Sequence, residues 1–144
     1  MKYRQKIKYC ILLCLSFIVF SCNKYKEIFH DVAKIKIFIY IDEDDYIDRE
    51  NYFIEITDIN EIKNIFKYIT SVPSPSYKCG YNGAIEFYCK NNNLLLDISF
   101  NTDCNTVVFV YNDKLYTRRI SNKGIEHIEN IIKEITEKYN KKSI

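Results

Sequence analysis

AIEFYCKNNNLLLDISF, residues 84–100, is the stretch of sequence that decides the fold of this chain. Residues 84–89 and 94–100 are rich in β-branched and aromatic residues, which favour strands. The polar segment between them, residues 90–93, has the composition of a turn. The stretch therefore predicts an antiparallel hairpin.

The pairing register of this hairpin follows from its apolar pattern. A four-residue loop sets Cys89 opposite Leu94, so that Phe87 faces Leu96 and one face of the hairpin is apolar throughout. A slip by one residue would set Phe87 against Asp97, which the burial of one face disfavours. We therefore expect the first register.

The same register predicts a disulfide bond. Extended beyond the hairpin, it brings Cys79 directly opposite Cys104, on the side facing the core, whereas Cys89 lies at the turn end, about ten residue pairs away at about 3.3 Å each. We expect a Cys79–Cys104 disulfide and a buried free thiol at Cys89. A bulge at Gly80 or Gly83 would shift this register by one. Three unpaired thiols or a metal site are the alternatives, and the cysteines lack the CxxC spacing of zinc sites.

The rest of the chain adds further strands and two amphipathic helices. Alternation of polar and apolar residues predicts strands at 32–41, 51–56, 106–111 and 114–120. Apolar spacings of three and four predict helices over 58–70, with Asp58 and Glu61 as a capping pair, and from Ser121 or Asn122 onward. The prolines of segment 72–76 end the first helix.

These elements predict an α+β domain over residues 32–140. Their order is ββαββββα, with a single antiparallel sheet of about six strands and two helices packed on one face. No linker or internal repeat divides the segment, and its length suffices for one core.

The N-terminus has the pattern of a secretory signal peptide. Four basic residues and no acid precede an apolar run of 11 residues, Cys10 to Phe20. Because a membrane span needs about 20 apolar residues, this run is too short for a transmembrane helix. We expect residues 1–21 to be a cleaved signal peptide.

The end of this segment, Val19-Phe20-Ser21-Cys22, resembles the lipobox of bacterial lipoproteins, with Phe20 in place of the usual small residue. The resemblance implies that Cys22 is the site of lipid attachment and that the signal is cut before it. Residues 22–31 would then form a lipidated tether. Two or more acyl chains anchor a protein stably, so the expected location is the bacterial cell envelope, with the domain facing the periplasm or the exterior.

Charge argues against nucleic-acid binding. The chain has 21 basic and 19 acidic residues. Loss of the four basic residues of the signal peptide leaves 17 basic and 19 acidic residues, and the basic excess disappears. No basic patch remains to attract nucleic acid.

No catalytic, metal-binding or cofactor-binding motif is apparent. The acidic segment 42–50 holds six carboxylates, but it lacks the glycine and terminal glutamate of a calcium loop. His30 lies in the tether and His127 on the flank of the last helix, without the partners of a catalytic triad. We therefore expect a protein that is not an enzyme and has no cofactor.

The aromatic residues of the predicted strands indicate a binding role. They are Phe38, Tyr40, Tyr88, Tyr111 and Tyr116, and tyrosine on an exposed sheet face suits contacts with a protein or glycan. We expect a lipid-anchored binding or scaffold domain with an envelope protein or glycan as partner. Alternatively, Tyr77-Lys78-Cys79 followed by glycine resembles the opening strand of membrane-bound lysozyme inhibitors, which implies a periplasmic inhibitor of a hydrolase such as lysozyme. The inhibitory Ser-Gly loop of that family is not found downstream.

Overall fold

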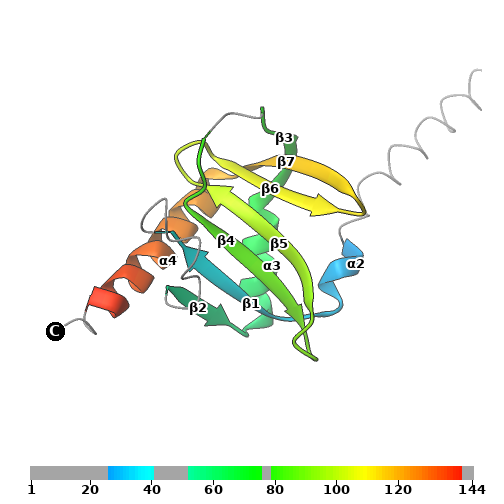
Figure 1. Ribbon diagram of the computed structural model, residues 1–144, viewed down its shortest axis with the longest axis horizontal. Helices are drawn as coiled ribbons and strands as arrows, with labels where there is room; N and C mark the ends of the chain where they lie inside the picture. Colours follow the sequence, from blue (N-terminus) through cyan, green and yellow to red (C-terminus); the bar gives the residue numbers. More distant parts are fainter. Residues whose placement is uncertain (1–25, 41–51, 76–78, 141–144) are drawn as a thin grey trace, which may run out of the picture. The chain divides into compact units, whose positions relative to one another are not determined.

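The computed structural model describes residues 26–40, 52–75 and 79–140 (Figure 1). The chain divides into two compact units, Met1–Asp31 and Val32–Ile144. In the first unit the described residues form a single helical turn, α2 (Lys26–Phe29), which the Asp31 N–H closes by donating to the Ile28 carbonyl at 3.2 Å. All further elements belong to the second unit.

The second unit is an α+β domain with one open antiparallel sheet of seven strands. The strands are ordered β2-β1-β4-β5-β6-β7-β3 across the sheet. Strand β1 therefore has β2 on one side and β4 on the other, and β3 lies at the far edge, beside β7. Their bounds are β1 Val32–Ile39, β2 Phe53–Ile56, β3 Ile69–Pro73, β4 Gly83–Cys89, β5 Leu94–Asn101, β6 Thr106–Tyr111 and β7 Lys114–Ile120.

Two helices lie behind the sheet in the view of Figure 1. They are α3 (Ile59–Tyr68) and α4 (Asn122–Asn140). As expected, Asp58 caps α3, because its carboxylate accepts from the Asn60 and Glu61 N–H groups at 2.8 and 2.9 Å. The Glu61 carboxylate points instead toward α4, where it lies 3.8 Å from His127 Nε2.

The core lies between the sheet and these helices. The ring of Phe66 on α3 meets the ring of Phe87 on β4 edge to face, with centroids 6.1 Å apart. Gly83 lets β4 approach β1 and β5, since a Cβ there would lie 2.1 Å from the Phe38 carbonyl oxygen. The largest fully buried side chains are Phe87, Phe100, Ile35, Ile37, Ile62, Ile65, Ile85, Ile98, Ile135 and Val107.

The seventh strand of the sheet, β3, was not predicted from the sequence. Helix α3 ends at Tyr68, two residues earlier than expected, and the chain turns directly into an extended conformation at Ile69. Pro73 ends a strand rather than a helix, and its lack of an N–H is tolerated because β3 is the edge of the sheet. The six-strand expectation therefore falls short by one.

The register of the central hairpin is confirmed over most of its length. Ile85 pairs with Ile98, and Phe87 pairs with Leu96, as the apolar pattern requires. Near the turn the register shifts, so that Leu94 pairs with Tyr88 and not with Cys89. The shift is a bulge at the turn end, whereas the sequence had suggested Gly80 or Gly83 as its place.

Candidate binding surface

The strand register assigns side chains to the sheet face that lies opposite to the helices, which we call the open face. Successive side chains of a strand alternate between the two faces. Because Ile35 and Phe87 point into the core, Lys34, Lys36 and Tyr88 lie on the open face. Neither α3 nor α4 covers this face in Figure 1.

A row of charged side chains crosses the middle of the open face. Lys36 pairs with Glu55 on one side and with Glu86 on the other, and Glu86 pairs with Asp97 of the next strand. Two like charges directly opposite each other are unfavourable. Lysine side chains reduce this electrostatic cost. Lys36 lies between Glu55 and Glu86 in the ladder, and Lys34 Nζ lies 3.0 Å from Glu55 Oε2.

Tyr88 organises the same region. Its hydroxyl donates a hydrogen bond to Oε2 of Glu86, which is only 9% exposed. The Nζ atoms of Lys34 and Lys36 each lie 5.7 Å from the centroid of its ring, within the range of a cation–π interaction. Burial, and then the hydrogen bond to Glu86, raise the pKa of Tyr88 to about 12. The phenol is therefore a neutral, oriented donor at physiological pH.

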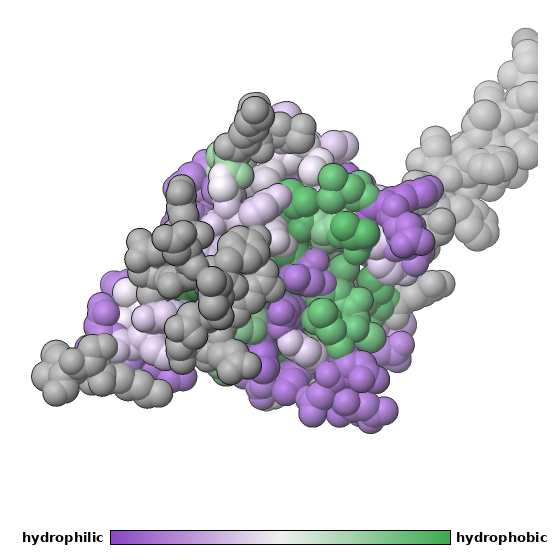
Figure 2. All heavy atoms as spheres, viewed as in Figure 1, coloured by the Kyte–Doolittle hydropathy of each residue, from purple (hydrophilic) through white to green (hydrophobic). Residues whose placement is uncertain are grey.

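Apolar side chains are exposed on the other part of the open face. Val110 and Leu115, which are register partners in β6 and β7, are 60% and 69% exposed, and Leu94 at the start of β5 is 51% exposed. Figure 2 shows hydrophobic side chains gathered on this side, with hydrophilic residues between and around them. We call Leu94, Val110 and Leu115 the apolar patch.

The apolar patch was not predicted from the sequence. The aromatic residues of the strands were expected to carry the binding role, but the register divides them between the two faces of the sheet. Phe38 and Tyr88 lie on the open face, whereas Tyr116 pairs with Phe109 on the helix-covered face, and their rings stack with centroids 5.3 Å apart. A usable signal was present, since strand TVVFVY (106–111) is apolar at positions of both faces.

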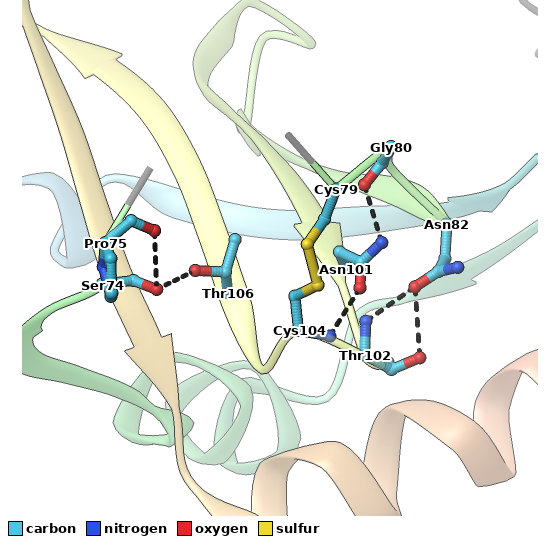
Figure 3. The surroundings of a disulfide bond; sticks show 9 residues. All are labelled: Ser74, Pro75, Cys79, Gly80, Asn82, Asn101, Thr102, Cys104 and Thr106. Atoms are coloured by element: carbon cyan, nitrogen blue, oxygen red, sulfur yellow. Dashed lines mark hydrogen bonds between the residues drawn. A yellow bond between two sulfur atoms is a disulfide. The ribbon is translucent and has the colours of Figure 1, made fainter. Parts of the chain in front are cut away.

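The expected disulfide joins Cys79 and Cys104, with Cα atoms 6.6 Å apart (Figure 3). The two residues do not form a pair in the ladder, however, and they are half-buried rather than facing the core. Cys79 precedes β4, and Cys104 lies in the turn between β5 and β6. Beyond the backbone hydrogen bond from the Asn82 N–H to the Phe100 carbonyl at 2.9 Å, side-chain hydrogen bonds hold the two segments together.

Two asparagines provide these hydrogen bonds (Figure 3). Asn101 Nδ2 donates to the Gly80 carbonyl at 2.7 Å, and Asn101 Oδ1 accepts from the Cys104 N–H at 2.7 Å. Asn82 Oδ1 accepts from the Thr102 N–H at 2.6 Å. The disulfide and these hydrogen bonds together hold one corner of the sheet, which we call the disulfide corner.

Predictions were also made for Cys89 and Cys22. Cys89 is a free thiol, as expected, but it is half-buried at the turn end of the hairpin rather than buried. Cys22, the expected lipid attachment site, lies outside the described residues, as do Tyr77 and Lys78.

The two histidines considered from the sequence have different surroundings. His127 links the two helices, because its ring lies against Tyr68 with centroids 5.5 Å apart. His30 is exposed in the first unit, and the acidic segment 42–50 lies outside the described residues. Within residues 26–40, 52–75 and 79–140, no group of three or more His, Cys, Asp or Glu side chains could hold a metal ion.

The open face carries side chains of the kinds found at protein interfaces. It combines charged side chains with exposed apolar ones, as protein interfaces do. Among the described helices, none is long and apolar enough to cross a membrane.

Comparisons with models of protein families, with curated proteins and with solved structures find no match to this chain.

Proposed function

We propose that this protein is a lipid-anchored, non-enzymatic binding domain of the bacterial cell envelope, and that the open face of its sheet contacts a partner protein. The observation that carries the proposal is the exposure of Leu94, Val110 and Leu115 on one sheet face. Exposed apolar side chains on one surface favour a contact that removes them from water.

The polar part of the open face favours a protein over a purely apolar partner. Lys36, Glu86 and Asp97 form a fixed pattern of charge beside the apolar patch. Complementary charges on a partner would select its orientation, while the apolar patch would supply the buried centre of the contact.

The anchor part of the proposal rests on the resemblance of residues 19–22 to a lipobox. Metabolic labelling with an alkyne-tagged palmitate should mark the protein, and Cys22→Ser should abolish the label. Labelling that persists in the Cys22→Ser variant would contradict lipid attachment at this residue.

Site-specific crosslinking tests the binding part. A photo-crosslinking amino acid at Leu115 should give one defined adduct in native envelopes, and the second substitution Val110→Asp should abolish that adduct. The same crosslinker at Glu129, on the exposed side of α4, serves as the control and should give none. Equal adducts from both positions would contradict a specific open face.

An enzymatic assay distinguishes the hypothesis of a lysozyme inhibitor from the proposed binding role of the open face. If the purified protein slows lysozyme at micromolar concentration or below, and Val110→Asp leaves that inhibition intact, then the open face is not the functional surface and the inhibitor hypothesis replaces the present proposal.

A further inference from the structure

A cavity of about 360 Å³ lies at the β3 edge of the sheet, beside the disulfide corner. We call it the edge cavity. Its walls come from β3, from the turn between β5 and β6, from the end of β7 and from the first residue of α4. Its volume falls within the range of small-molecule sites.

The walls of the edge cavity are fixed by hydrogen bonds that do not involve a ligand. Thr70 Oγ1 donates to the Arg119 carbonyl at 2.9 Å, and Thr117 Oγ1 donates to the Ser74 carbonyl at 2.8 Å, so that β3 is tied to β7 at both ends. The Ser74 hydroxyl also accepts from Thr106 Oγ1 across the opening of the β5–β6 turn (Figure 3). The cavity is therefore formed before anything binds.

Arg119 is the charged side chain of this cavity. Among the described residues that line it, no other carries a charge, and the Arg119 guanidinium has no hydrogen bond or ion pair with any described residue. Its neighbour Arg118 differs, because its Nη1 donates to the Thr117 carbonyl at 2.8 Å and its guanidinium carbon lies 5.2 Å from the centroid of the Tyr116 ring. The alternation of β7 places the two arginines on opposite faces.

The other lining residues indicate what Arg119 could bind. The side-chain amides of Asn105 and Asn122 supply further hydrogen-bond donors, while the exposed Val72 and Pro75 contribute apolar surface. A guanidinium binds a carboxylate through two parallel hydrogen bonds. A phosphate dianion would meet only one positive charge here, and the apolar wall would form no favourable contact with it.

We propose that the edge cavity is a binding site for a small organic carboxylate, whose anionic group pairs with Arg119 and whose apolar body lies on Val72 and Pro75. A free carboxylic acid and the C-terminal carboxylate of a peptide share this chemistry.

Titration followed by NMR tests this site on the full chain in detergent micelles. N-acetyl-leucine should shift the side-chain amide signals of Asn105 and Asn122, whereas N-acetyl-leucinamide, which lacks the charge, should not. Isobutyrate and a leucine-terminated tripeptide distinguish a free acid from a peptide C-terminus, according to which binds more tightly. Inorganic phosphate should bind at least tenfold more weakly than N-acetyl-leucine.

Substitutions on β7 and α4 provide the controls. Arg119→Gln should weaken N-acetyl-leucine binding at least tenfold, Arg119→Lys should weaken it less, and Arg118→Gln should leave it unchanged. Asn122→Asp should also weaken binding of N-acetyl-leucine, because it keeps the Arg119 guanidinium but adds a carboxylate that repels the ligand. Equal binding of the amide, tighter binding of phosphate, an equal loss in Arg118→Gln, or no amide shift at 10 mM N-acetyl-leucine would overturn the proposal.

Discussion

The Cys79–Cys104 disulfide offers the most quantitative test of how this domain is stabilised. The bond joins residues 25 positions apart in sequence. The double substitution Cys79→Ala/Cys104→Ala removes it and leaves the seven-strand sheet intact, because neither cysteine lies in a strand. The perturbation therefore acts mainly on the unfolded chain, which regains the freedom that the cross-link removes.

The expected magnitude follows from the loop that the bond closes. For a separation of 25 residues the chain-entropy relation gives about 3.5 kcal/mol at 25 °C. In a domain of a little over 100 residues, 1 kcal/mol corresponds to about 4 °C in Tm, so the double variant should melt about 14 °C lower.

Differential scanning calorimetry of the full chain in detergent measures this difference. Treatment of the unmodified protein with a phosphine reductant should lower Tm by the same amount, while the double variant should not respond to the reductant. Cys89→Ala is the matched control, since its thiol is free and half-buried, and it should keep the full response to reduction.

Two results would refute this reasoning. A Tm loss below about 4 °C, which corresponds to about 1 kcal/mol, would show that the side-chain hydrogen bonds of the corner already restrain the two segments. A response to the reductant that disappears in Cys89→Ala would show that a different pair of cysteines is bonded.

Three further predictions concern packing, turn geometry and pH. Gly124→Ala should lower the free energy of unfolding by about 2 kcal/mol, because the added Cβ would lie 2.4 Å from the Cβ of Tyr68; urea unfolding checks it. Asp113→Gly should raise that free energy by about 1 kcal/mol in the same assay, since Asp113 has a φ of 59° in the turn between β6 and β7. Because the raised pKa of Tyr88 favours its protonated form in the folded state, the stability it contributes is complete below pH 10 and is lost as the pH rises toward 12. Stability should therefore fall less steeply between pH 10 and 12 in Tyr88→Phe than in the unmodified protein, and equal slopes would contradict a special environment for this phenol.

Local pattern was sufficient for most elements of the fold. Alternation along β1 and the stripe of isoleucines along α4 identify the buried sides of both elements, because burial imposes the period of the backbone on the sequence. Asp58 is recognisable as a cap for a similar reason, since its side chain bonds only to N–H groups two and three residues ahead.

Contacts between distant segments decided the parts that the sequence did not predict. Strand β3 has no strong pattern of its own, and it is extended because β7 offers it an edge to pair with. The bulge beside Tyr88 shifts the hairpin at the turn, and the run of three leucines, residues 94–96, hides the change of alternation that the bulge causes. The edge cavity, likewise, is lined from four separate segments.

The sequence by itself determined the buried sides of β1 and α4, the α+β class of the domain and the identity of the bonded cysteines, because each depends on apolar periodicity within a strand, a helix or one hairpin. Only the tertiary structure decided that the tyrosines divide between two faces, that Val110 and Leu115 stay exposed and that Arg119 lines a cavity. These properties depend on which strands are neighbours and on which face the helices cover. Both are settled by the packing of the whole chain, which no local period records.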